Sequence, residues 1–478
     1  MNELHYPSRL RLTLPFLAAI LALVGLAQAQ PGGVGPTRLA GIFGDNMVLQ
    51  REARVNVWGW DAPGTRIQLS SSWGATAEAT ADESGYWKAV LETAEASGPH
   101  VLTVEGVDTV HVRNILLGEV WLASGQSNME MPMRGFGNQP ITDSQRELLN
   151  ANKPMIRTFR VERTRSDEPA RELNGTWHVS SPATLKEFSA VAYFFADTLL
   201  GQLDVPIGMI GSYWGGTVIE AWMKEEVLAG NFADEELHTP GRQPGRSTLY
   251  NGMIHPLIPF TIKGVIWYQG ESNRHRPQYY RRLLAAMVES WRTEWRQGDF
   301  PFYYVQISPY DYDGRHAVGT ALLREAQLQA LDDIPNAGMV VSLDYGNCLC
   351  IHPFDKRPIG ERLAYWALKH QYGFDFLQAA GPVLREMTIE GNQAILSFDN
   401  APNGLVSRYE SLDEFQIAGS NRIFFPATAF VNRNGTLTVM APEVTEPVAV
   451  RYAFRNCPQA TLFNTEGLPA SSFRTDDW

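Results

Sequence analysis

Four short polar segments of the chain hold residue types that could carry nucleophilic catalysis, and each follows an apolar run of strand length. They are Gly125–Glu130, Ser212–Thr217, Trp267–Asn273 and Asp344–Pro353. Ligands of an open parallel sheet bind outside the carboxyl ends of its strands, so polar segments directly after buried strands are the first candidates for a site.

The first segment offers a nucleophile, Ser127. Gly125 permits a sharp turn at the end of the strand, and this turn would lift the Ser127 hydroxyl clear at the start of a helix. A nucleophilic serine needs that exposure together with nearby backbone donors. The alternative interpretation is that Ser127 only caps the helix, as serines commonly do.

The last segment offers a base, His352. It is one of ten histidines, and an arbitrary histidine is more often structural than catalytic. His352, however, follows a late strand, which is where the base of a triad belongs when the serine comes first in the chain.

The two middle segments offer donors for an oxyanion. The paired glycines Gly215 and Gly216 would let a backbone N–H approach a developing negative charge, although an ordinary glycine turn has the same sequence. The side-chain amide of Gln269, or that of Asn273, could serve the same purpose. Glu271 is a carboxylate in a segment that should be partly buried, so we expect it to have hydrogen-bonding partners.

The elements that must position these groups are strands alternating with helices. After the apolar run Ile115–Ala123, further strands are predicted at Pro206–Gly211, Gly264–Tyr268, Pro301–Ile307 and Gly338–Leu343. Amphipathic helices such as Val191–Leu200 fill the intervals, which is typical of a parallel sheet covered on both faces.

Short alternating runs flank this α/β portion on both sides. Those before it, such as Val55–Trp60, predict a small antiparallel sandwich, and those after it, such as Ala394–Phe398, predict a second all-β region. We therefore divide the chain into a sandwich at residues 30–113, a catalytic domain at 114–375 and a C-terminal β region at 376–478.

The first 29 residues read as a secretory signal. Arg9 and Arg11 precede the apolar run Leu12–Leu26, and the small residues Ala27 and Ala29 follow it, which predicts cleavage after Ala29 rather than an uncleaved anchor. The sequence thus predicts export to the periplasm or the medium, with no membrane attachment after cleavage.

The composition limits the kinds of partner and ligand that the protein can be expected to bind. The 478 residues carry a formal net charge of −12, which makes a nucleic-acid role improbable.

The chain has three cysteines, an odd number, so at least one is unpaired or bonded elsewhere. Either Cys348 or Cys350 could form a disulfide with Cys457, and the sequence does not decide between them. Cys348, Cys350 and His352 could also be metal ligands, but no second cluster supplies the remaining positions, and we predict neither metal nor cofactor.

Four motifs together resemble the sialate O-acetylesterase family. They are GEVWLASGQSNMEMPM, IGMIGSYWGGTVIEAW, LYNGMIHPLIPFTIKGVIWYQGESN and IHPFDKRPIGERLA, at residues 118–133, 207–222, 249–273 and 351–364. Residues 43–51 and 460–476 resemble the opening and closing segments of the same family, so the resemblance covers nearly the whole chain after the signal.

This resemblance implies an SGNH-hydrolase core that removes acetyl groups from a sialic acid or another glycan through an acyl-enzyme. It implies Ser127 as nucleophile, His352 as general base, and the amides of Ser127 and Gly216 with the Gln269 side chain as oxyanion donors. The expected partner is an O-acetylated carbohydrate, and no oligomeric state is predicted.

One position departs from the family pattern. Many relatives carry an aspartate two residues before the histidine, where it can hold the imidazole, but this chain has Cys350. Either a backbone carbonyl or Asp344 orients His352, or Glu271 supplies the carboxylate, or the protein is a carbohydrate-binding relative with weakened catalysis. Loss of an orienting acid can cost up to about 10⁴-fold in kcat.

Overall fold

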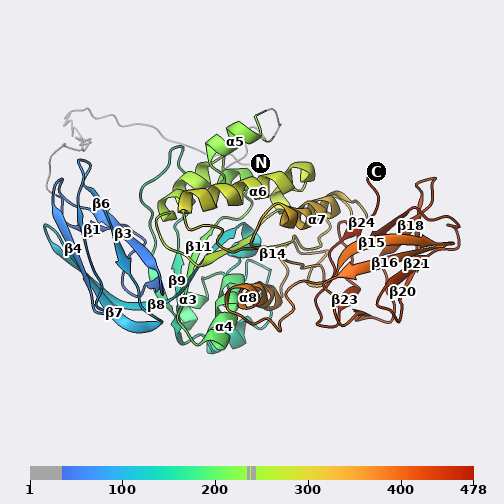
Figure 1. Cartoon of the computed structure of the whole chain (residues 1–478), viewed down its shortest axis with the longest axis horizontal. Coiled ribbons are helices and arrows are strands. Elements are labelled where there is room, and N and C mark those ends of the chain that lie inside the picture. The colour runs from blue at the N-terminus through green and yellow to red at the C-terminus, as the bar shows by residue number, and fades with distance from the viewer. Residues whose placement is uncertain (1–34, 234–236, 238–243) are drawn as a thin grey trace, which may run out of the picture.

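A computed structural model describes residues 35–233, 237 and 244–478 of the chain (Figure 1). The predicted signal at residues 1–29 lies outside the described residues. In Figure 1 the N-terminal strands lie at the left, a sheet flanked by helices at the centre and the C-terminal strands at the right.

The N-terminal strands form two facing sheets. One contains β1 (Arg38–Leu39), β3 (Arg54–Trp60) and β6 (Tyr86–Glu92); the other contains β2 (Val48–Gln50), β4 (Arg66–Ser71), β5 (Thr76–Thr80), β7 (Ser97–Glu105) and the start of β8 (Thr109–Gly125). Buried residues alternate with exposed ones along β4 and β6, as expected for strands with one face on a core. The predicted antiparallel sandwich is present, except that β2 pairs with β8 in parallel.

Strand β8 joins this sandwich to the central sheet. Its first part pairs with β7, whereas the residues from Glu119 to Gly125 pair with β11 (Ile207–Tyr213). Asn114, at a φ of 57°, lies in the strand at the point where its register with β7 shifts. The boundary that we place between residues 113 and 114 therefore falls inside one continuous strand.

The central sheet has the order β10-β9-β11-β8-β12-β13-β14 and is parallel from β9 to β14. Besides β8 and β11, its strands are β9 (Lys153–Arg160), β10 (Trp177–Ser180), β12 (Gly264–Tyr268), β13 (Phe302–Val305) and β14 (Ala337–Val340). The edge strand β10, which was not among the predicted strands, pairs with β9 in antiparallel. The chain places β9 and β11 on one side of β8 and β12, β13 and β14 on the other, so the strand order reverses at β8.

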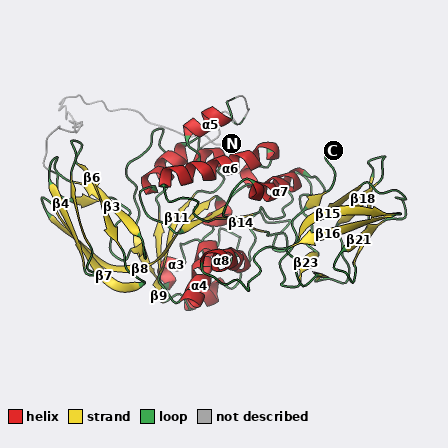
Figure 2. Ribbon diagram, in the orientation of Figure 1, coloured by secondary structure: helices red, strands yellow, loops and turns green. Residues whose placement is uncertain are grey.

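Helices cover both faces of this sheet (Figure 2). The described α-helices are α1 (Ser127–Glu130), α2 (Ser144–Leu149), α3 (Pro182–Leu185), α4 (Ala190–Leu203), α5 (Glu225–Asn231), α6 (Pro277–Trp295), α7 (Gly319–Gln329) and α8 (Arg357–Gln371). Trp121 and Ala123 of β8 pack in one apolar cluster with α4 and α8, while Val120 and Leu122 pack in the other with α6 and α7. Both faces of β8 are thus buried, which is why its sequence is apolar without alternation.

The C-terminal residues form an all-β region. Its strands are β15 (Val383–Glu390), β16 (Gln393–Asp399), β17 (Leu405–Ser407), β18 (Phe415–Ala418), β19 (Phe424–Pro426), β20 (Thr428–Val431), β21 (Leu437–Met440), β22 (Ala449–Tyr452), β23 (Leu462–Asn464) and β24 (Phe473–Arg474). They build two four-stranded sheets, β15-β16-β21-β20 and β19-β18-β22-β24, and the pair β17-β23.

Candidate active site

Ser127 lies at the carboxyl end of β8, where the strand order reverses. Gly125 adopts a φ of 132°, and a Cβ on it would lie 2.2 Å from the carbonyl oxygen of Tyr268, so the turn requires glycine. The N-cap of α1 is Gln126, and Ser127 is the first residue of the helix, so the helix-cap interpretation of Ser127 is wrong. Ser127 is half-buried between two buried neighbours.

The residues around Ser127 connect it to the second and third polar segments. The Oε2 atom of Glu130 accepts a hydrogen bond from the Gly215 N–H at 2.8 Å, and a Cβ on Gly215 would lie 3.1 Å from that of Ser127. The Oε1 atom of Gln126 accepts a hydrogen bond from Gln269 Nε2 at 3.2 Å. The structure therefore brings both of these segments against the Gly125–Glu130 turn.

Asn128 connects the turn to the fourth segment. Its Nδ2 donates to Glu271 Oε1 at 2.6 Å and to the carbonyl of Ile351 at 3.1 Å, and its Oδ1 accepts a hydrogen bond from Lys356 Nζ at 2.5 Å. The residue after Ser127 is thus bonded to the residue before His352. All four polar segments meet at one edge of the sheet.

Burial shifts the pKa values of the two ionisable groups that bond to Asn128, Glu271 and Lys356. It raises the pKa of Glu271, whose Oε2 is buried without a partner among the described residues. It also lowers the pKa of Lys356 to about 7, against the opposing effect of Glu271. Asn128 separates the two charged groups and bonds to both.

The imidazole of His352 is held by one turn that follows α1. Its Nδ1 lies 2.5 Å from Oε1 of Gln139, and its ring packs edge-on against Phe136 with the ring centres 5.2 Å apart. Burial, and secondarily Lys356, lowers the pKa of His352 to about 4. Within the described residues, no hydrogen bond joins Ser127 Oγ to the imidazole; such contacts often tighten only when substrate binds.

None of the carboxylates considered from the sequence reaches His352 Nδ1. Asp344 forms a two-point ion pair with Arg362, at 2.8 and 2.6 Å, in which both side chains are buried. Glu271 bonds to Asn128, and the Cys350 thiol donates to the backbone carbonyl of His352 at 3.2 Å. The sequence reasoning missed Gln139, which stands 213 residues before the histidine and carries no motif that would reveal it.

The two glycines of the second segment differ in their surroundings. The Gly215 N–H donates to Glu130, and its backbone is partly buried. Gly216 is exposed and adopts a φ of 77°. The geometry thus leaves Gly216, not Gly215, on the accessible side of the turn.

The Gln269 amide is engaged inside the protein. Its Nε2 lies within hydrogen-bonding distance of Gln126 Oε1, the Thr217 carbonyl and Asn273 Oδ1, and its Oε1 accepts a hydrogen bond from Tyr280. The Asn273 amide donates to Glu220 at 2.8 Å. In this structure, therefore, neither side chain presents the oxyanion donor that the sequence predicted.

A cavity of about 250 Å³ adjoins the site. It is lined by Glu130, Pro132, Arg134, Phe136, Arg160, Arg163 and Glu187. Arg160 and Arg163 both pair with Glu130, and Arg134 pairs with Glu187. Trp214, which precedes Gly215 in the chain, is half-buried, and the Arg163 guanidinium lies 5.2 Å from the centre of its ring. Trp267 is fully buried in the core.

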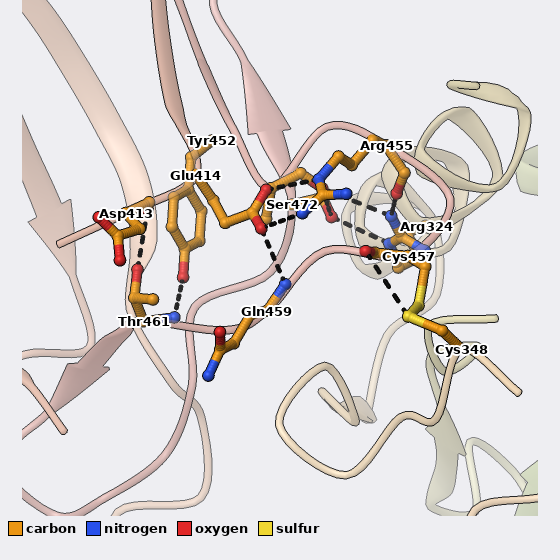
Figure 3. Close-up of polar contacts among 11 residues, drawn as sticks. Arg324, Cys348, Asp413, Glu414, Tyr452, Arg455, Cys457, Gln459, Thr461 and Ser472 are labelled. Atoms are coloured by element: carbon orange, nitrogen blue, oxygen red, sulfur yellow. Dashed lines mark hydrogen bonds and ion pairs between the residues drawn. A yellow bond between two sulfur atoms is a disulfide. The ribbon is translucent and has the colours of Figure 1, made fainter. Parts of the chain in front are cut away.

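Two cysteines form a disulfide. Cys348 pairs with Cys457 (Figure 3), and Cys350 carries a free thiol. The sulfur of Cys348 is therefore not available as a metal ligand, and the described residues contain no group of three His, Cys, Asp or Glu side chains that could hold an ion. Across the part of the chain that the structure describes, no helix is long and apolar enough to cross a membrane.

The chain is similar in sequence to known carbohydrate esterases. The family model described as carbohydrate esterase, sialic acid-specific acetylesterase, matches residues 117–364. The chain is 29% identical to the sialate O-acetylesterases of Pongo abelii and Homo sapiens. Each alignment runs over 513 positions and covers 96% of this chain and 95% of the relative.

The fold has a similar solved structure. A crystal structure of a novel carbohydrate acetylesterase from Xanthomonas citri matches with a TM-score of 0.86 and 39% identity, and the match covers 93% of this chain and 100% of the other. The similarity therefore extends through the parallel sheet and both flanking β regions.

Proposed function

The chain belongs to the carbohydrate esterase family of sialic acid-specific acetylesterases, and from this premise we propose that it hydrolyses acetyl esters with Ser127 as nucleophile and His352 as base. It is a carbohydrate O-acetylesterase, a carboxylic-ester hydrolase. The proposal concerns which residues carry the reaction and on what substrate.

In the proposed reaction, Ser127 Oγ bonds to the acetyl carbonyl carbon while His352 Nε2 takes the hydroxyl proton. The tetrahedral intermediate collapses, the bond from carbon to the sugar oxygen breaks, and His352 returns the proton to that oxygen. A water molecule then attacks the same carbon while His352 takes a proton from it. The bond from that carbon to Ser127 Oγ breaks, His352 returns the proton to Oγ, and the acetic acid released loses its own proton to solvent as acetate. No cofactor enters either half of the reaction.

The backbone amides of Ser127 and Gly216 are the proposed oxyanion donors. Gln269 keeps a part in the proposal, but as a support: its Nε2 contacts Gln126 and the Thr217 carbonyl, which adjoin Ser127 and Gly216 in the chain. It would hold the two backbone donors at a fixed separation. Losing one such donor can cost on the order of 100-fold in rate.

One observation carries the proposal. Asn128 adjoins the nucleophile in the chain, Ile351 adjoins the base, and the two are hydrogen-bonded at 3.1 Å across the edge of the sheet where the strand order reverses. A serine on a glycine-containing turn and a histidine on the neighbouring loop, held together at this edge of the sheet, form an arrangement suited to acyl transfer.

The substrate that we propose is an O-acetylated sialic acid or another O-acetylated glycan. The curated relatives are sialate O-acetylesterases, which favours the first, whereas the solved relative is called a carbohydrate acetylesterase. The carboxylate of a sialic acid would favour a nearby arginine, and Arg134, Arg274 and Arg324 are candidates by sequence. Of these, Arg134 lines the cavity beside the site. Arg324 is fully buried and bonded to Ser472, so it is not such a residue.

We also propose that the protein is exported and is organised in the three parts predicted from the sequence. A disulfide between Cys348 and Cys457 suits an oxidising compartment. It joins the loop that carries His352 to the C-terminal β region, so that region would help to hold the catalytic part.

The test is acetate release from 4-nitrophenyl acetate, an O-acetylated sialic acid and an O-acetylated plant glycan. We expect release by the protein and by the control variant Ser70→Ala, whose serine is exposed on β4, and loss of release in Ser127→Ala and His352→Ala. Full activity in Ser127→Ala would refute the proposed nucleophile.

A second function is favoured by one feature, the absence of a carboxylate on His352 Nδ1 among the described residues. A carbohydrate-binding protein with weakened catalysis would release no acetate from any of the three substrates yet bind the acetylated glycan. Binding without release, measured by calorimetry on the unmodified protein, would select this function over the esterase.

A further inference from the structure

We propose that Gln139 is the positioning residue of the catalytic histidine, a neutral acceptor that takes the place of the aspartate missing at position 350. This inference rests on the proposed function, because it assigns how His352 is held while it acts as base. It adds a residue that lies outside all four polar segments.

The contact itself fixes which imidazole nitrogen can act. Gln139 Oε1 lies 2.5 Å from His352 Nδ1. An amide oxygen only accepts, so it selects the tautomer in which Nδ1 carries the hydrogen and Nε2 has the free electron pair. A serine hydrolase needs this tautomer, and in a triad the carboxylate selects it in the same way.

The turn that carries Gln139 is built to stay in place. The backbones of Phe136 and Gln139 exchange two hydrogen bonds, at 3.0 and 3.1 Å, across Gly137 and Asn138. A Cβ on Gly135 would lie 2.3 Å from the Gln139 carbonyl oxygen, so the close approach requires glycine.

The same turn contacts the imidazole twice. Phe136 packs edge-on against the ring, and Gln139 bonds to its Nδ1. One contact restricts the plane of the ring and the other restricts its rotation. A residue that merely filled space would not need both.

The other groups near His352 are engaged elsewhere, so among the described residues Gln139 is the acceptor for its Nδ1. Asp344 is paired with Arg362, and Cys350 is bonded to a backbone carbonyl. Lys356 acts on the imidazole as a like charge, not as an acceptor. The charged residues of the adjoining cavity, which Phe136 also lines, are Glu130, Arg134, Arg160, Arg163 and Glu187, and they pair with one another.

A neutral acceptor has a consequence that an aspartate would not have. A carboxylate beside an imidazole raises its pKa, because it stabilises the protonated ring. Gln139 adds no charge, and the pKa of His352 stays lowered, at about 4. The histidine therefore remains an unprotonated base well into the acid range, and we expect the acid limb of kcat/KM near pH 4.

The experiment compares Gln139→Met and Gln139→Glu with the unmodified protein, using acetate release from 4-nitrophenyl acetate over a range of pH. Gln139→Met keeps the length of the side chain and removes the acceptor, so we expect kcat to fall by about tenfold or more with KM little changed. Gln139→Glu restores an acceptor and adds a charge, so activity at neutral pH should be retained while the acid limb moves up by about one to three pH units.

The controls distinguish a failure of the role of Gln139 from a failure of the proposed esterase mechanism. Gln202→Met alters an exposed glutamine at the end of α4 and should change neither kcat nor the pH profile. If Ser127→Ala abolishes release but Gln139→Met leaves kcat intact and Gln139→Glu leaves the acid limb in place, the role of Gln139 is refuted and the esterase mechanism stands. If Ser127→Ala retains full release, the mechanism itself fails.

Discussion

Removing the disulfide between Cys348 and Cys457 should destabilise the chain and loosen the segment that carries the base. Cys348 stands four residues before His352, and Cys457 follows β22 in the C-terminal β region. The bond thus restrains the histidine loop from a part of the chain that contributes no other residue to the proposed chemistry. The perturbation is the double substitution Cys348→Ala and Cys457→Ala, which leaves no partner for an exchanged disulfide.

The size of the effect follows from the loop that the bond closes. The two cysteines are separated by 109 residues. A cross-link over roughly 100 residues restricts the unfolded chain by about 4.7 kcal/mol in the chain-entropy description, and typical measured values are about 2–4 kcal/mol. Other contacts at this junction remain in the variant. The buried Arg324 donates to Ser472 and to the carbonyls of Ala453 and Arg455 (Figure 3), so we expect the lower part of this range.

The assay is urea unfolding followed by tryptophan fluorescence, with and without a thiol reductant. The double variant should unfold at lower urea than the unmodified protein, and reductant should move the unmodified protein toward the variant while leaving the variant unchanged. Cys350→Ala keeps the disulfide and is the matched control. Equal unfolding free energies for the oxidised protein and the double variant would refute the reasoning, because the bond would then restrain nothing.

Two further predictions concern buried charges. Arg362→Met leaves the carboxylate of Asp344 buried without its partner and should lower the unfolding free energy by about 3–5 kcal/mol in urea unfolding, with much of the loss recovered when Asp344→Asn is added. For Lys356, the pKa is about 7 in the folded protein against 10.5 in a free side chain. Between these values the unfolded chain binds the extra proton, so this lysine makes stability rise with pH. Urea midpoints from pH 7 to 9 should rise less steeply in Lys356→Met, and an unchanged slope would contradict the lowered pKa.

The sequence predicted the central strands well because they are long apolar runs bounded by glycine and polar residues. The strand predicted at Gly264–Tyr268 has the observed bounds of β12, and the helix predicted at Val191–Leu200 lies within α4. The strand predicted at Gly338–Leu343 pairs with β13 only as far as Val340, since its last residues stay buried after the ladder of hydrogen bonds ends. Apolar character indicates burial, and it does not locate the end of strand pairing.

What the sequence could not predict was how side chains divide their hydrogen bonds once the segments meet. Gln269 was a plausible oxyanion donor by residue type, yet its amide is used by Gln126 and Thr217. Glu271 and Asp344 were plausible acids by position, yet each has another partner. Residue type limits what a group can do, whereas only the fold decides which of several acceptors is nearest.

Cys350 stands where the family resemblance predicts an aspartate, and a cysteine suits the charges around that position. Lys356 is buried beside the site, and both Glu271 and Cys350 act on its pKa in the direction of the charged form. A carboxylate at position 350 would therefore be drawn to Lys356 as well as to the imidazole, and the two demands would compete. In this chain different residues contact the lysine and the imidazole. Asn128 bonds to both Glu271 and Lys356, and Gln139 accepts a hydrogen bond from His352 without adding a charge. On the proposed assignment, orientation and charge balance are thus carried by separate residues.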